Sequence, residues 1–267
     1  MREIKALKST KMVIPKNELK DFLDTKVLQY NTIDFIEPDP ISVPHRYSLK
    51  EDIEIAGFLA STIAWGNRTM ITKNGHRMMD ILGDSPFDFV MSHDECQLEK
   101  LEGFVHRTFN ADDFKHFITA LKHIYTNRGG LEKIFSDNQT KTSLQPAIHA
   151  LNEAFFEIPH LTRTRKHVAD PNKGSVAKRI NMCLRWFVRN DNTGVDLGIW
   201  KNISPSKLSC PLDVHSGNVA RKLGLLDRKQ NDGKALNELD NSLRKLDPTD
   251  PVKYDFALFG LGIFEGF

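Results

Sequence analysis

Apolar residues recur at the spacing of an α-helix in segment after segment of this 267-residue chain. One such stripe comprises Ile55, Leu59 and Ile63, and residues 252–264 are strongly apolar throughout. No stretch alternates apolar and polar side chains convincingly, as a half-buried strand would. The sequence therefore predicts an all-α protein, which we expect to form two lobes with a cleft between them.

Composition indicates a globular protein. Hydrophobic residues make up 40% of the chain, enough to bury a sizeable core at this length. No run of about 18 apolar residues is present, so no membrane span is expected. The first twenty residues lack the apolar segment of a signal peptide. We therefore expect a cytoplasmic protein.

The cysteine and histidine patterns argue against a metal or disulfide framework. The three cysteines, Cys96, Cys183 and Cys210, form no CxxC pair, and three residues cannot hold a four-cysteine iron–sulfur cluster. No HExxH motif or zinc spacing occurs among the ten histidines. We expect no metal cofactor of these kinds.

Charge is distributed unevenly, although the net charge of +2 is small for a nucleic-acid-binding protein. Residues 161–190 hold eight basic residues against the single acid Asp170, an excess of +7. The eight are Arg163, Arg165, Lys166, Lys173, Lys178, Arg179, Arg185 and Arg189. A basic face would suit a phosphate backbone. A solvated helix face is the alternative.

Lys178 lies in the basic segment and is a candidate nucleophile. Gly174 and Ser175 predict a turn and cap, followed by a helix from about Val176. Lys178 flanks the apolar stripe of that helix, and apolar walls and nearby cations both disfavour an ammonium. A neutral lysine amine can attack a carbon centre and form a Schiff base. The alternative is a lysine on a solvated basic face.

Asp213 stands 35 positions after Lys178, before a second apolar pattern that includes Val219 and Leu223. Aspartate is a preferred helix N-cap, and capping alone would explain its position. A cap can also face a cleft, where its carboxylate could stabilise an oxocarbenium-like sugar or activate a nucleophile. We expect Lys178 and Asp213 to share one cleft.

Three segments resemble the helix-hairpin-helix DNA glycosylases. "PLDVHSGNVARKLGLL" is similar to their aspartate segment, "GSVAKRINMCLRW" to the helix with the lyase lysine, and residues 58–83 to their early helix and loop. The wide spacing from Lys178 to Asp213 is nearest the archaeal 8-oxoguanine glycosylase branch, and the chain resembles a bacterial group near this superfamily. "DPNKGS" replaces the usual hairpin "LPGVG", so Lys173 stays an alternative to Lys178.

The resemblance implies a two-lobed, multihelical glycosylase-like fold. Residues 1–49 and 191–267 would form the terminal lobe, and residues 50–190 the central lobe with the hairpin. It also implies a base-excision repair enzyme, with β-lyase activity on an oxidised purine such as 8-oxoguanine. Lys178 would attack C1′ of a nucleotide flipped from the duplex, and Asp213 would stabilise the positive charge that develops there.

Further residues are expected to contact the nucleic acid. Trp65, Asn67, Arg68 and Arg107 would bind the substrate, Asn67 as the side chain that enters the duplex or reads the opposite base. The duplex backbone would be bound by Lys173, Gly174, Ser175, Arg179 and His215. For Trp65 and Arg107 a structural role is the alternative. Double-stranded DNA is the expected partner, and the protein is expected to be a monomer. No cofactor is expected, although the hairpin could hold a monovalent cation.

Two other functions fit the same sequence. A helical nucleic-acid-binding protein could retain the fold without catalysis, with Asp213 acting only as a cap. A helical protein that binds proteins or small molecules could carry the basic stretch merely as a solvated face.

Overall fold

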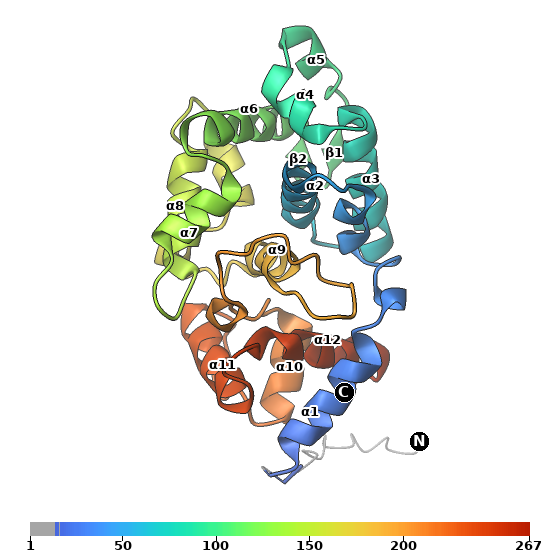
Figure 1. The fold of residues 1–267 in the computed structure, drawn as a ribbon, viewed down its shortest axis with the longest axis vertical. Helices are drawn as coiled ribbons and strands as arrows, with labels where there is room; N and C mark the ends of the chain where they lie inside the picture. Colours follow the sequence, from blue (N-terminus) through green and yellow to red (C-terminus); the bar gives the residue numbers. More distant parts are fainter. Residues whose placement is uncertain (1–13, 16) are drawn as a thin grey trace, which may run out of the picture.

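The structure, a computed structural model, describes residues 14–15 and 17–267, and helices dominate them (Figure 1). Within these residues the strands are confined to β1 (Val105–His106) and β2 (Phe109–Asn110). They form a short antiparallel ladder in which Val105 pairs with Asn110 and His106 with Phe109. The prediction of an all-α protein is confirmed. The first part of the expected terminal lobe, residues 1–13 and 16, lies outside the described residues.

A first hydrophobic core lies in the upper part of Figure 1, around helix α2 (Lys50–Thr62). The helices around it are α3 (Arg68–Leu82), α4 (Pro86–Ser92), α6 (Ala111–Asn127), α7 (Leu131–Asn138), α8 (Gln145–Phe155) and α9 (Lys178–Val188). The short α5 (Glu95–Glu99) buries none of its residues. Eleven of the thirteen residues of α2 are buried, as expected of a helix enclosed on all sides.

The burial of α2 includes a carboxylate, that of Glu54. Its two oxygens accept hydrogen bonds from the Tyr125 hydroxyl and the Trp200 indole, each at 2.6 Å. A buried charge without such partners would be costly. The long connection that contains Trp200 is therefore attached to the centre of the first core.

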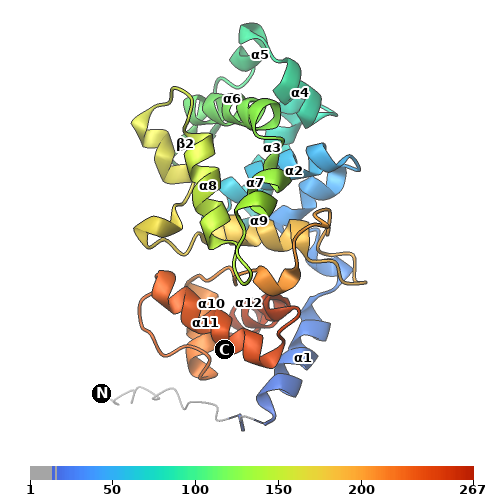
Figure 2. The same ribbon diagram turned by 60° about the vertical axis from the view of Figure 1, so that its left-hand side comes forward.

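A second core joins the two ends of the described chain. It lies among α1 (Leu19–Tyr30), α10 (Val214–Lys222), α11 (Gly233–Leu246) and α12 (Tyr254–Phe264), in the lower part of Figures 1 and 2. Helices α1 and α12 pack closely, since a Cβ atom at Gly260 would lie 2.1 Å from the ring of Tyr30. Only glycine permits this approach.

Short 3-10 helices connect the longer ones. They are η1 (Ile33–Phe35), η2 (Pro40–Ser42), η3 (Pro44–Arg46), η4 (Thr162–His167), η5 (Pro171–Lys173), η6 (Pro205–Lys207) and η7 (Pro251–Lys253). Five of the seven begin with proline, whose fixed φ suits the first position of a helix.

Helix α9 lies between the two cores (Figures 1 and 2), and its polar face is buried rather than solvated. Arg185 and Arg189 are 3% and 1% exposed. The expectation that both contribute to a basic surface is therefore wrong. Charge counting missed this because their acidic partners follow later in the chain.

Four carboxylates neutralise these two arginines. Arg185 donates to Asp196 at 3.1 Å and to Asp255 at 2.5 Å. Arg189 pairs with Asp196 as well, with Asp250 at 2.9 Å and with Asp191 at 2.8 Å. Since buried charges require partners, this cluster determines how the 190–196 and 250–255 segments pack on α9.

Acid should destabilise the fold through His167. Burial lowers the pKa of His167 to about 4, although Asp113 raises it in part. Below pH 6.5 the unfolded chain binds a proton that the folded chain excludes, so stability is lost as pH falls from about 6.5 to 4. We expect a loss of about 3 kcal/mol from this residue, measured by urea unfolding across that range.

The matched variant is His167→Gln, whose side chain does not titrate. Its free energy of unfolding should depend less steeply on pH between the same limits, while buried His116, whose pKa burial also lowers to about 4, keeps its own contribution. Equal slopes for variant and wild type would contradict this assignment.

Candidate active site

The turn before α9 places Lys178 at the start of the helix. Asp170 caps η5, Gly174 follows with a left-handed φ of 80°, and the Ser175 hydroxyl accepts from the amide of Ala177 at 3.1 Å. Ala177 itself has a φ of 44°, a left-handed conformation that costs a non-glycine residue about 1 kcal/mol. Helix α9 thus begins at Lys178, two residues later than the sequence predicted.

Asp213 is the N-cap of α10, and its two carboxylate oxygens have different environments. Oδ1 accepts from the amides of His215 at 2.9 Å and Ser216 at 3.0 Å, and the Ser216 hydroxyl accepts from the Asp213 amide at 2.9 Å. This is a capping box. Oδ2 lies 3.6 Å from Nζ of Lys178. The residue is therefore a cap and also faces the lysine.

The lysine and the aspartate meet from the N-terminal ends of two helices. Their side chains keep 30% and 29% of their surface exposed, so both can be reached from solvent. Helix N-termini carry partial positive charge, which stabilises the Asp213 carboxylate and does not stabilise an ammonium at Lys178. The sequence-based expectation that the two share one cleft agrees with this 3.6 Å separation.

A cavity of about 570 Å³ opens over the pair, and we call it the cleft. Its volume lies in the range of small-molecule sites. Apart from the pair, its walls include Trp65, Arg68, Arg179, Met182, His215 and Phe259. Sequence reasoning missed two of these. Met182 could have been found, since it follows Lys178 by four positions on one helix face; Phe259 had no local signal.

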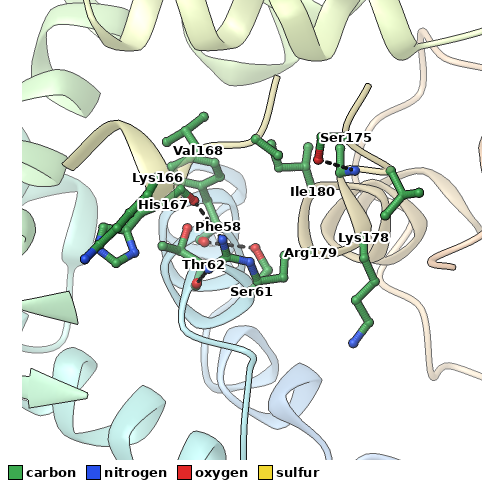
Figure 3. A pocket seen from close by; sticks show the side chains of 13 residues that line it. Phe58, Ser61, Thr62, Lys166, His167, Val168, Ser175, Lys178, Arg179 and Ile180 are labelled. Carbon is green, nitrogen blue, oxygen red and sulfur yellow. Dashed lines mark hydrogen bonds between the residues drawn. The ribbon is translucent and has the colours of Figure 1, made fainter. Parts of the chain in front are cut away.

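Trp65 is half-buried, and its ring lines the cleft and contacts the side chain of Arg179. The Arg179 guanidinium lies 4.9 Å from its ring, and burial lowers the pKa of Arg179 to about 10. This guanidinium donates to the main-chain oxygens of Thr62 and His167. Figure 3 shows Arg179 turned toward Thr62, whereas Lys178 extends another way. Arg179 is better placed to hold Trp65 than to bind a phosphate.

Arg68 belongs to the wall of the cleft, whereas its neighbour Asn67 does not. Arg68 donates to Asp39 at 2.7 Å, and its guanidinium lies 5.3 Å and 5.2 Å from the rings of Phe35 and Phe259. Asn67 is exposed and caps α3 by accepting from the Met70 amide at 3.1 Å. Its expected entry into a duplex stays a prediction.

Arg107 lies outside the walls of the cleft, in the turn between β1 and β2. It is exposed, has a positive φ of 56° and packs beside Gly66. The preceding His106 is buried and hydrogen-bonds to Asn74 and to the main-chain oxygen of Trp65. The turn between β1 and β2 therefore helps to hold the main chain at Trp65 through the hydrogen bond from His106.

The turn expected to bind a phosphate lies against α11. Lys173 is exposed and lies 3.8 Å from Asp170, and the Gly174 oxygen accepts from the Gly233 amide at 3.1 Å. A cavity of about 400 Å³ beside this contact is lined by Gly174 and Ser175 of the turn and by Gly233 and Leu236 of α11. Of the two lysines considered as nucleophile, Lys178 is the one that lines the cleft opposite Asp213.

Metal-ligating side chains do not gather in the described part of the chain: no three His, Cys, Asp or Glu residues there could together hold an ion. None of the described helices is long and apolar enough to cross a membrane.

A family described as a protein of unknown function, DUF2400, matches residues 39–264. No curated protein and no solved structure matches the chain. The matched range contains every residue of the cleft.

Proposed function

We propose that the chain, which belongs to the DUF2400 family, is a DNA glycosylase with β-lyase activity that removes an oxidised purine such as 8-oxoguanine. The observation that carries the proposal is the 3.6 Å approach of Lys178 Nζ and Asp213 Oδ2 in the wall of an accessible cavity. An amine and a carboxylate in contact are the groups that such a reaction needs.

The helical framework supports the glycosylase-like, two-lobed fold that the sequence resemblance implies. The pair comes from α9 at the edge of the first core and from α10 in the second core. A nucleotide between the two cores would reach both groups at once. Trp65 and Phe259 offer aromatic surfaces on which a flipped base could stack.

In the proposed reaction the amine of Lys178 forms a bond to C1′ of the flipped nucleotide while the bond from C1′ to the base breaks. The base leaves with that electron pair and takes a proton from the new ammonium. The nitrogen lone pair then opens the sugar ring, O4′ gains a proton from water, and a protonated Schiff base remains. Asp213 Oδ2 stabilises the positive charge that develops at C1′.

Contacts with the duplex backbone are proposed for exposed groups around the cleft. His215 lies at its wall and is exposed, and the turn of Lys173, Gly174 and Ser175 offers an ammonium and a hydroxyl. Such groups position a duplex without reading its sequence. We propose a cytoplasmic monomer that needs no cofactor beyond a monovalent cation at that turn.

Borohydride trapping tests the proposal. Wild-type protein should form a covalent adduct with duplex DNA that contains 8-oxoguanine or an abasic site, because borohydride reduces the Schiff base. Lys178→Ala should form none. Lys173→Ala is the matched variant, and at saturating DNA it should still form the adduct.

Three outcomes separate the alternatives. Wild type that forms no adduct and excises no base contradicts the enzyme, and DNA binding that weakens steeply with salt would then indicate a non-catalytic nucleic-acid-binding protein. Excision without an adduct or a strand nick would indicate a glycosylase that acts through Asp213 alone. An adduct that survives in Lys178→Ala but not in Lys173→Ala would move the nucleophile to Lys173.

A further inference from the structure

A second, smaller cavity shares the Lys178–Asp213 pair with the cleft. Its volume is about 40 Å³, and we call it the inner cavity. Lys178 and Asp213 belong to the walls of both spaces. The carboxylate of Asp255, on α12, lines the inner cavity but not the cleft. The pair thus lies between the expected substrate and a buried acid.

The two oxygens of Asp255 are used unequally. Oδ2 accepts from Arg185 at 2.5 Å, whereas Oδ1 has the Cys210 thiol at 3.8 Å, and a thiol is only a weak donor. Asp255 is 6% exposed, and its burial raises the pKa of the carboxyl group although Arg185 opposes this rise. Oδ1 therefore retains the capacity to accept a proton.

The charged and titratable groups around Asp255 come from several separate segments of the chain. Helix α9 contributes Lys178 and Arg185, with Arg189 and Asp196 behind Arg185. Cys210 precedes α10, Asp213 is the N-cap of α10, and Asp39 is the N-cap of η2. Within this set Asp213 must stay ionised to stabilise C1′, and the two oxygens of Asp39 already accept from Arg68 and from the Ile41 amide. Asp255, whose Oδ1 faces only the weak thiol donor among the described residues, is left as the acceptor in the wall of the inner cavity.

The proposed reaction requires such an acceptor. Lys178 attacks only as an amine, so its ammonium must first lose a proton. The inner cavity, at about 40 Å³, has room for a water molecule, which needs roughly 10–15 Å³ and polar partners. Lysine and carboxylate groups line it as those partners.

We propose that Asp255 accepts the proton of Lys178 through water in the inner cavity, an inference that rests on the proposed glycosylase function. The proton leaves Nζ, the water passes a proton to Asp255 Oδ1, and the nitrogen keeps its electron pair. One positive and one negative charge disappear together, so the net charge beside the substrate does not change. Asp255 acts through Lys178 and does not touch the substrate.

The test is the pH dependence of adduct formation in Asp255→Asn under single-turnover conditions. At neutral pH the variant should be about 100-fold slower than wild type, the size of a general-base contribution. Its rate should rise about tenfold per pH unit and approach that of wild type near pH 9, because hydroxide then removes the proton instead.

Asp196→Asn is the matched control. Asp196 pairs with the same Arg185 but does not line the inner cavity. This variant should keep the pH profile of wild type, so that loss of a partner for Arg185 is separated from loss of the proton acceptor.

Several results would overturn the inference. An Asp255→Asn profile parallel to wild type, or a rate lowered equally at every pH, would make Asp255 structural. Should the variant fail to fold, a high-resolution crystal structure of wild type decides instead: a water bonded to both Asp255 Oδ1 and Lys178 Nζ supports the relay, and its absence rejects it. Wild type without any adduct rejects the glycosylase itself, whereas an adduct with an unchanged profile rejects only the role of Asp255.

Discussion

Asp213→Asn should lower the rate of the proposed base excision at least about 100-fold and leave the fold almost as stable as before. Asparagine caps helices as well as aspartate does, and its side-chain oxygen can still accept from the amides of His215 and Ser216. The substitution removes only the negative charge that Oδ2 presents to Lys178 and to the substrate. The free energy of unfolding should therefore change by less than about 0.5 kcal/mol.

Asp232→Asn is the control for this experiment. Asp232 caps α11 by accepting from the amides of Lys234 and Ala235, and it does not line the cleft. Its replacement should leave the excision rate unchanged. If Asp213→Asn excises the base as fast as wild type, Asp213 acts only as a helix cap and has no role in catalysis.

Asp213→Ala completes the comparison, because it removes both the cap and the charge. Stability should then fall by about 1 kcal/mol, the usual cost of losing an N-cap. Activity should fall no further than in Asp213→Asn. The separation of the two effects follows from the different partners of Oδ1 and Oδ2.

Local patterns in the sequence predicted the features that depend on residues close together in the chain, namely helices and their caps. Helical periodicity predicted the all-α class, and the position of Asp213 before an apolar stripe predicted its cap. The start of α9 was predicted two residues too early because Ala177 adopts a left-handed conformation. Only a glycine at this position would have suggested such a conformation from the sequence.

Contacts between distant segments could not be predicted from periodicity. The approach of Lys178 to Asp213 was a hypothesis drawn from two predicted helix starts and from the resemblance to a family, since spacing along the chain does not determine spacing in a fold. Phe259 reaches the cleft from the opposite end of the chain, and no feature near residue 259 indicates this. Buried arginines were missed for the same reason, as a surface charge and a paired internal charge look identical in a sequence.

Arg189→Ala is expected to be the most destabilising of the substitutions considered, at about 3–5 kcal/mol. Arg189 is 1% exposed and holds Asp191, Asp196 and Asp250, and burial lowers its pKa less than these carboxylates raise it. Without the guanidinium, the fully buried Asp196 keeps only Arg185 as a partner. Urea unfolding followed by circular dichroism measures the loss.

Two further variants show whether the loss of stability in Arg189→Ala comes from the lost charge or from lost packing. Lys166→Ala, an exposed change in the same basic segment, should alter stability by less than about 0.5 kcal/mol. The double variant Arg189→Leu with Asp196→Leu removes the buried charge on both sides, and it should recover part of the loss because an apolar pair needs no ionic partner. The double variant could instead have a lower free energy of unfolding than Arg189→Ala. In that case the loss in Arg189→Ala does not come from unpaired charge. Packing of its aliphatic stem would then explain the burial.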